Sequence, residues 1–271
     1  MNFALGDLSD RQFEKVSNIV YRECGISLKC GKEALVRARL TKRLRALKME
    51  KFSEYFRYLE SDSGREELGL MIDVMTTNKT SFFRERAHFD FLGETVLPTL
   101  SGRRLRFWSA ACSSGEEPFS LAMFLLEMMP GLGSQDVKIL ATDISPTILE
   151  KAGRATYEEG MLLGLPSTFI RKYFVKVGNR NSRTYQVSGD VRKMVKIARL
   201  NLLDPWPMKG PFTVIFCRNV MIYFDRQTQQ RLVNRFWEML EPGGYLFVGH
   251  SEGMSGAKHK FRYVQPATYV K

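Results

Sequence analysis

The sequence is poor in the residues that build disulfide and metal frameworks. It has four cysteines and three histidines among 271 residues. The cysteines lack any C-x-x-C spacing, and His88, His250 and His259 are scattered along the chain without a metal-binding constellation. We therefore expect free thiols, a reducing compartment and no metal cofactor.

Long apolar runs are also missing. No signal peptide opens the chain, and no uncharged run approaches the roughly 18 residues that span a bilayer. Hydrophobic residues still make up 44% of the chain and aromatic residues 12%, which is enough for a sizeable core and excludes a disordered chain. We expect a folded cytoplasmic protein of two modest domains, without membrane insertion and without an obligate assembly, and hence a monomer.

Acidic residues are too few to balance the basic ones, and the formal net charge is +12. The imbalance is concentrated, because residues 29–51 hold nine Lys or Arg residues against Glu33 and Glu50. Within this segment, residues 32–48 place apolar side chains at helical spacing and basic ones between them. A basic amphipathic helix suits an acidic partner, which can be a nucleic acid, an anionic membrane or an acidic protein surface.

The N-terminal part of the chain has only helical patterns. Ser9 and Asp10 can cap a first helix, and two further helical patterns follow the basic helix at 52–60 and 66–75. The sequence therefore predicts an all-helical N-terminal domain over residues 1–90.

Strand and helix patterns alternate in the rest of the chain, over residues 91–271. Strands are expected at 105–111, 137–142, 195–203, 213–216 and 245–249, and helices at 118–129, 146–152 and 226–240. This alternation is typical of a mainly parallel, doubly wound α/β sheet. Between about 157 and 193 the rhythm is broken by a turn at 178–181 flanked by strand-like runs, which predicts a β-hairpin inserted into the α/β domain.

The segment 104–126 carries the strongest functional signal. A strand leads into a small-residue turn that ends at Gly115, and a helix opens with Glu116 and Glu117. A strand, a glycine turn and a helix in this order cradle a nucleotide-like cofactor at the carboxyl ends of parallel strands. The turn has one glycine instead of three, and two carboxylates stand where phosphate charge would fall. The motif predicts a cofactor with a nucleoside but no phosphate, such as S-adenosylmethionine, although the glutamates can also simply complement the helix dipole.

Polar residues follow the ends of the other expected strands. Asp143 can accept hydrogen bonds from both ribose hydroxyls of a nucleoside, or it can cap the next helix. Asn201 and Leu202 lie where a strand end can read an adenine edge, with a plain turn as the alternative. Arg218 and Asn219 interrupt an apolar stretch just past a buried strand, and we expect them to line a site because unpaired polar groups are costly there.

Together these segments resemble the CheR-type chemotaxis receptor methyltransferases. The matching stretches are TTNKTSFFRE (76–85), FWSAACSSGEEPFSLAM (107–123), ILATDIS (139–145), NLLD (201–204), FCRNVMIYFD (216–225) and LEPGGYLFVGHSE (240–252). The resemblance implies a Rossmann-like domain that binds S-adenosylmethionine over 91–271, with a small β-subdomain inserted at about 157–193. It also implies the preceding all-helical domain.

The resemblance assigns roles to individual residues. The residues implied to contact the cofactor are Asn78, Thr80, Arg84, Glu117, Asp143, Asn201, Leu202, Arg218 and Asn219. Among them, Glu117 would hold the methionine amino group and Asp143 the ribose. Arg84 and Tyr223 would be the residues closest to the methyl transfer.

The implied activity is methylation of glutamate side chains on the cytoplasmic helical bundle of chemoreceptors, with S-adenosylhomocysteine as product and no metal ion. The basic helix at about 32–48 would dock on the acidic receptor surface. Some family members also bind the receptor's C-terminal tail peptide with the β-subdomain. The hairpin here lacks the Arg-Gly-x-Gly loop of those members, so tail binding stays open.

Two other functions fit part of the sequence. A nucleic-acid methyltransferase would also combine a Rossmann-like domain with a basic appendage. No Asn/Asp-Pro-Pro-Tyr/Phe motif for a flipped base is present, so we expect no nucleic-acid partner. A non-catalytic signalling adaptor would keep the fold and use the basic face alone, but the presence of Arg84, Glu117, Asp143 and Tyr223 argues against it.

Overall fold

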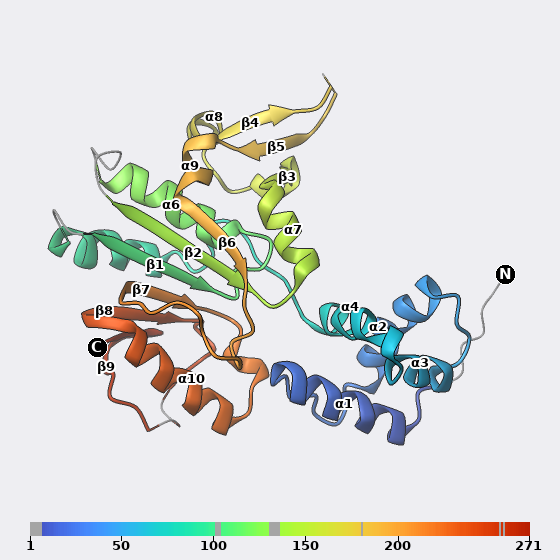
Figure 1. Ribbon diagram of the computed structural model, residues 1–271. Helices are drawn as coiled ribbons and strands as arrows, with labels where there is room; N and C mark the ends of the chain where they lie inside the picture. The colour runs from blue at the N-terminus through green and yellow to red at the C-terminus, as the bar shows by residue number, and fades with distance from the viewer. Residues whose placement is uncertain (1–6, 101–103, 130–135, 180, 255, 257) are drawn as a thin grey trace. The chain divides into compact units, whose positions relative to one another are not determined.

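The computed structural model describes residues 7–100, 104–129, 136–179, 181–254, 256 and 258–271. The chain forms two compact units, and Figure 1 labels most of their helices and strands. The helical unit comprises the residues up to Thr77 together with Tyr223–Asp225, and the α/β unit comprises 78–222 and 226–271. Residues 78–90, which the sequence pattern places in the helical domain, therefore pack with the α/β unit. Within the described ranges, no helix is long and apolar enough to cross a bilayer.

Four α-helices make up the described part of the helical unit: α1 (Asp10–Cys24), α2 (Glu33–Ala46), α3 (Phe52–Leu59) and α4 (Arg65–Met75). A capping box starts α1, because Ser9 Oγ accepts from the Gln12 N–H and the Gln12 side chain accepts from the Ser9 N–H. The apolar stripe of α2 is fully buried through Val36, Leu40 and Leu44. The expected amphipathic helix is therefore confirmed.

Two basic side chains of α2 are used inside the helical unit. The buried Glu67 carboxylate accepts from Arg43 Nη2 at 2.7 Å and from the Tyr55 hydroxyl at 2.8 Å. The Arg39 guanidinium donates to the Met75 carbonyl at 2.5 Å. The solvent-exposed cations of α2 and its flanks are Lys32, Arg37, Lys42, Arg45 and Lys48.

A seven-stranded sheet organises the α/β unit (Figure 1). Its strands in spatial order are β6 (Val195–Arg199), β2 (Val137–Asp143), β1 (Leu105–Ala110), β7 (Phe212–Cys217), β8 (Leu240–Val248), β10 (Thr268–Val270) and β9 (Arg262–Gln265). The first five strands are parallel, and β10 is antiparallel to both of its neighbours. This order confirms the mainly parallel, doubly wound sheet and adds a C-terminal hairpin that the sequence pattern does not predict.

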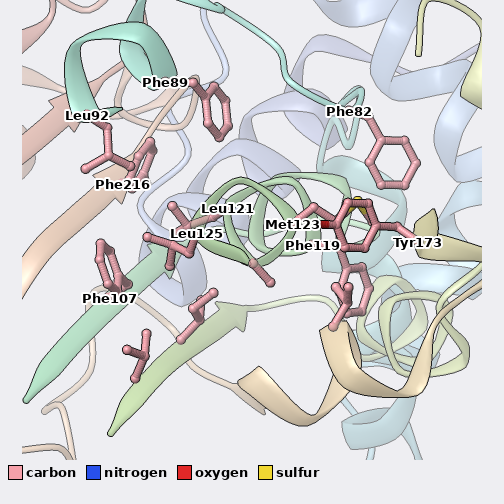
Figure 2. Packing of buried hydrophobic residues seen from close by; sticks show 14 of the residues in the cluster. Phe82, Phe89, Leu92, Phe107, Phe119, Leu121, Met123, Leu125, Tyr173 and Phe216 are labelled. Atoms are coloured by element: carbon pink, nitrogen blue, oxygen red, sulfur yellow. The ribbon is translucent and has the colours of Figure 1, made fainter. Parts of the chain in front are cut away.

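Helices pack on both faces of this sheet. They are α5 (Ala87–Phe91), α6 (Glu116–Met128), α7 (Pro146–Arg154), α9 (Gly189–Met194) and α10 (Arg226–Met239). Successive side chains of a strand point to opposite faces. On β1, Phe107 joins the apolar cluster that includes Leu121 and Leu125 of α6 (Figure 2). The next residue, Trp108, packs edge-on against Phe236 of α10, with ring centroids 5.5 Å apart.

A small antiparallel sheet is inserted between α7 and β6. Its strands in spatial order are β3 (Thr156–Glu158), β5 (Thr184–Val187) and β4 (Phe174–Val177), and α8 (Ser167–Tyr173) leads into β4. Phe174 and Val187 belong to the same apolar cluster as Phe119 of α6, so the insertion shares the core of the α/β unit. The expected β-subdomain is confirmed, and β4 forms one edge of its sheet.

One strand is shorter than the sequence predicts, since β6 ends at Arg199 and not at 203. The neighbouring β2 ends at Asp143, whose carbonyl accepts from the Leu200 N–H at 2.9 Å. Beyond this point the chain has lost its partner strand. The Asn201 side chain then accepts from the Leu203 N–H at 3.1 Å, which closes a turn in place of further strand.

Candidate cofactor and active site

The turn after β1 is tightly wound and opens directly into α6. Gly115 has φ +97°, and a Cβ there would lie 2.9 Å from the Phe119 ring and 3.0 Å from the Tyr157 hydroxyl. This position therefore requires glycine. Across the part of the chain that the structure describes, no side chain caps the first turn of α6. The backbone N–H groups at the start of the helix can therefore receive an anionic group.

Asp143 ties this turn to the end of β2. Its buried carboxylate accepts from the Ser113 N–H at 2.9 Å and from the Ser145 N–H at 3.0 Å. The cap of α7 is Ser145, whose Oγ accepts from the Ile148 N–H at 3.1 Å. The helix cap considered for Asp143 in the sequence therefore belongs to Ser145. A carboxylate oxygen accepts more than one hydrogen bond, so ribose binding by Asp143 stays a prediction.

Arg218 lies between two carboxylates at the end of β7. The residue is only 6% exposed. Its Nη1 donates to Glu117 Oε2 at 2.9 Å, and its Nη2 donates to Glu85 Oε2 at 3.0 Å and to the Arg84 carbonyl. Ser109 Oγ of β1 donates to the other oxygen of Glu117 at 2.7 Å. The guanidinium thus joins three segments that are far apart in the sequence.

Glu85 is a member of this network that the sequence analysis does not predict. Its Oε2 accepts from Arg218, and its Oε1 accepts from Asn219 Nδ2 at 3.3 Å and from the His250 N–H at 3.4 Å. Burial alone would raise the pKa of Glu85, but the Arg218 guanidinium and these hydrogen bonds lower it below its ordinary value. The available signal was its place directly after Arg84, inside the motif at 76–85.

Glu252 braces the loop that carries Asn219. Its buried carboxylate accepts from the backbone N–H groups of Asn219 at 2.6 Å, Gly249 at 2.6 Å and Ile222 at 3.1 Å. A Cβ on Gly249 would lie 2.5 Å from Asn219 Nδ2. The ends of β7 and β8 therefore meet in close contact, with the carboxylate between them.

The loop from Asn78 to Arg84 belongs to the same edge of the α/β unit. Ser113 Oγ donates to the Asn78 carbonyl at 2.9 Å. Arg84 Nη1 donates to the Lys79 carbonyl at 2.9 Å, which folds the side chain along its own loop. Thr80 lies within this loop. Arg84 also contacts the network through its main chain, as the acceptor from Arg218.

Asn201 and Leu202 follow β6 at the other end of this edge. Leu202 is buried, and its carbonyl accepts from Arg235 Nη1 at 2.6 Å. The Arg235 guanidinium also lies over the Trp206 ring, 3.8 Å from its centroid. Helix α10 thus anchors the turn that we expect near the adenine.

Tyr223 belongs to the helical unit. Its carbonyl accepts from the Ser27 N–H at 2.8 Å, beside a β-bridge between Phe224 and Ile26. The expected closeness of Tyr223 and Arg84 stays a prediction.

The two glutamates at the start of α6 have different surroundings. Glu116 is 1% exposed, and its Oε2 accepts from Ser114 Oγ at 2.6 Å. Its Oε1 finds no donor among the described residues, and burial raises its pKa above the ordinary value. Glu117 contacts Arg218 instead, so Glu117 is the member of the pair that faces the network.

Two histidines that lie far apart in the sequence meet beside Glu85. The rings of His88 and His250 are 4.9 Å apart, and His88 Nδ1 lies 3.5 Å from Glu85 Oε2. Burial, together with the positive charge of Arg218, lowers the pKa of His88 to about 3. The expectation of scattered histidines is wrong for this pair, because the end of β8 returns to α5.

The edge residues suit a ligand that combines a positive charge, a carboxylate and a nucleoside. Glu85 and Glu117 outnumber the single guanidinium of Arg218, so the network has one net negative charge beside the first turn of α6. The helix N-terminus favours a carboxylate, and Asp143 can accept from hydroxyl groups. A phosphate group would instead meet two carboxylates. The set fits an amino acid joined to a nucleoside.

Two family models together match nearly the whole chain. Residues 11–76 match the CheR methyltransferase all-alpha domain, and residues 78–270 match the CheR methyltransferase SAM binding domain.

Curated relatives are similar over the same length. A probable chemotaxis protein methyltransferase of Rhizobium etli is 43% identical, covering 93% of this chain and 96% of the relative. The chemotaxis protein methyltransferase of Borreliella burgdorferi is 40% identical, covering 98% of this chain and 95% of the relative. The one of Escherichia coli is also 40% identical, covering 94% and 88%.

Proposed function

Since the chain belongs to the CheR methyltransferase family, we propose that it transfers the methyl group of S-adenosylmethionine to glutamate side chains of chemoreceptors. S-adenosylmethionine-dependent methyl transfer in chemotaxis follows from the family and from the names of its relatives. The observation that carries the proposal for this chain is the network of Arg218 with Glu85 and Glu117. It joins three of the family-like motifs at the carboxyl edge of the sheet.

The cofactor contacts are assigned from this edge. In the proposal, Glu117 holds the α-ammonium group, the first turn of α6 receives the carboxylate and Asp143 accepts from the ribose hydroxyls. Asn201 and Leu202 flank the adenine. The further residues that line the site are Asn78, Thr80, Arg84, Arg218 and Asn219.

The proposed reaction needs little acid–base catalysis by the protein. When bound, the cofactor would supply a methyl group on sulfonium sulfur, which a carboxylate oxygen would attack in line as the methyl–sulfur bond breaks and S-adenosylhomocysteine leaves. A glutamate has an ordinary pKa near 4.3, so it is already ionised at neutral pH and no general base is needed. The chain's own residues then act by positioning. We assign this to the Arg84 guanidinium and the Tyr223 hydroxyl, which would orient the substrate carboxylate without clamping it.

Substitution of Arg84 tests this positioning role. Arg84→Ala should lower kcat for receptor methylation by about tenfold to a hundredfold, because the carboxylate loses its orienting partner. The matched control is Arg86→Ala, which removes an exposed arginine that pairs with Asp90 on the surface. Full turnover in the Arg84 variant would count against the proposed role.

The exposed cations of α2 support an acidic protein surface as the partner. Arg39 and Arg43 bind partners inside the helical unit, and the other cations of α2 remain exposed to solvent. Charges of one sign on a helix raise the encounter rate with a surface of the opposite sign. The acidic face of the receptor bundle around the methylated glutamates is the proposed docking site.

Features of the β-subdomain support a second proposed contact, with the receptor's C-terminal tail peptide. An open pocket of about 530 Å³ lies between α8, β4 and β5, and it includes Arg171, Val175 and Lys176. Val175 is 58% exposed on the edge strand β4, where an extended peptide can add as a further strand. The two cations suit a terminal carboxylate. A tail peptide should bind the wild-type chain and lose affinity in Lys176→Glu, which reverses one of these charges.

Transfer of labelled methyl groups separates this function from its alternatives. Purified chain, labelled S-adenosylmethionine and either receptor membranes, RNA or DNA are incubated side by side. Base-labile label on the receptor supports carboxyl methylation. Label on nucleic acid supports the nucleic-acid methyltransferase, and binding to the receptor without label supports the non-catalytic adaptor.

A further inference from the structure

Glu85, His88 and His250 form a side-chain cluster within the α/β unit. They come from the loop before α5, from α5 and from the residues after β8. One donor atom of each residue lies within 4.8 Å of the other two. His88 Nδ1 is directed toward Glu85, at 3.5 Å from Oε2. Neither imidazole has a part in the proposed methyl transfer.

His88 is the observation that points to a ligand. Its side chain is completely buried, and neither Nδ1 nor Nε2 has a hydrogen-bond partner among the residues that the structure describes. A buried polar group left without a partner costs about 1 to 3 kcal/mol. Native proteins satisfy nearly all such groups, with protein, water or an ion.

Glu85 is already oriented as a ligating carboxylate would be. Arg218, Asn219 and the His250 N–H donate to its two oxygens and hold it in place. Carboxylates that bind metal ions in proteins are fixed by hydrogen bonds in this manner. A metal bond from Oε2 would replace one of the two hydrogen bonds that Arg218 donates to it.

We propose that Glu85, His88 and His250 bind one divalent transition-metal ion of the zinc type. Two imidazoles and one carboxylate are a donor set that zinc accepts, and imidazole donors select against magnesium and calcium. Metal–ligand bonds of about 2.0–2.1 Å place tetrahedral donor atoms about 3.4 Å apart, so the cluster contracts on binding. His250 is exposed, so its side chain is the one that supplies this movement.

Cobalt binding to the full chain tests the proposal directly. Co²⁺ reports its ligands through its visible absorption, and Zn²⁺ should displace it. We expect one equivalent of Co²⁺ to bind with a low-coordinate spectrum that lacks a thiolate charge-transfer band. His250→Ala should weaken binding by at least about tenfold. This variant alters an exposed side chain, so it leaves the core intact.

Two matched variants control for other donors. His259→Ala removes the remaining histidine, and Cys30→Ser removes the exposed thiol among the free cysteines of the described chain. Both should bind Co²⁺ like the wild type. Absence of binding, unchanged binding in His250→Ala or a thiolate band lost in Cys30→Ser would overturn the proposal. Each of these results is independent of methyl transfer, which is assayed separately.

Discussion

Arg218 lies at the centre of the contacts in the cofactor edge, which is the carboxyl end of the parallel strands with Glu85, Glu117, Asp143 and Asn219. Its side chain is nearly inaccessible, and its guanidinium is shared by Glu85 and Glu117. Burying a charge is costly unless it is paired and hydrogen-bonded. The three ionised groups therefore depend on one another, and the removal of the central one leaves two carboxylates without their cation.

Replacement of Arg218 should destabilise the α/β unit strongly. Arg218→Met keeps the length of the side chain but leaves both carboxylates unpaired, which should cost about 3–5 kcal/mol. Urea unfolding measures the loss. Arg154→Met is the matched control, because its partner Glu150 is exposed and the change should stay within about 0.5 kcal/mol. Equal losses in the two variants would show that the network carries no special stability.

The raised pKa of Glu116 predicts that the free energy of unfolding depends on pH. Its pKa is raised in the folded chain, so its contribution favours folding below the pKa of the unfolded chain and is lost as pH rises through the folded value. Glu116→Gln removes this term. The stability of the variant relative to wild type should therefore increase between about pH 4 and about pH 8.

Unfolding curves of the two proteins at both pH values measure this difference. Glu94→Gln is the control, because Glu94 is exposed. A relative stability of Glu116→Gln that stays level or falls with pH would contradict the assignment.

At the scale of elements, the site is made where parallel strands end. β7 and β8 finish side by side, and the Glu252 carboxylate accepts from backbone N–H groups of both ends. This arrangement sets the direction in which Arg218 and Asn219 leave β7. Gly249 permits it, because the neighbouring chain leaves no room for a side chain.

Gly249→Ala should therefore disturb the cofactor edge. The added Cβ would lie 2.7 Å from Glu252 Oε2 and 2.9 Å from the Asn219 nitrogen, so the loop must shift. We expect S-adenosylhomocysteine to bind about tenfold more weakly, as measured by calorimetry, and stability to fall by about 1–3 kcal/mol. Gly153→Ala is the control, because a Cβ there meets nothing within 4 Å. Equal affinity in the two variants would refute this role for the strand ends.

The sequence predicts these elements better than it predicts their contacts. Apolar runs identify five parallel strands, and polar residues just after them, such as Asp143 and Arg218, indicate the edge where a ligand binds. The sequence does not predict the role of Glu85, because its contact with Arg218 spans 133 residues and depends on the φ angle of +56° at Glu85. The contact between His88 and His250 is also not predicted, because it joins residues far apart in the sequence and depends on the order of the strands in the sheet.

At the scale of the whole molecule, the basic surface and the proposed cofactor site belong to different units. More than half of the excess of basic residues lies in residues 29–51, around α2 of the helical unit, and the cofactor edge lies on the α/β unit. Under the proposed function, the basic face would select the receptor and the cofactor edge would hold the methyl donor. Arg39 and Arg43 contribute to folding of the helical unit, so the docking face consists of the remaining exposed cations.

Charge reversal on that face should slow methylation without weakening cofactor binding. Lys42→Glu combined with Arg45→Glu should raise KM for receptor about tenfold or more, and the effect should shrink at high salt. S-adenosylhomocysteine affinity should be unchanged. Lys209→Glu is the control, since it alters an exposed lysine of the α/β unit. Normal receptor kinetics in the double variant would exclude α2 as the docking helix.

The central claim is that the acceptor is a glutamate carboxylate of a chemoreceptor, and identification of the methylated residue tests it most directly. The chain is incubated with S-adenosylmethionine and receptor, and the receptor peptides are sequenced by mass spectrometry before and after mild base. The account predicts methyl esters on glutamate side chains of the cytoplasmic bundle that disappear in base and that form about tenfold to a hundredfold more slowly with Arg84→Ala. Methyl groups that survive base, on nitrogen or on nucleic acid, would contradict it.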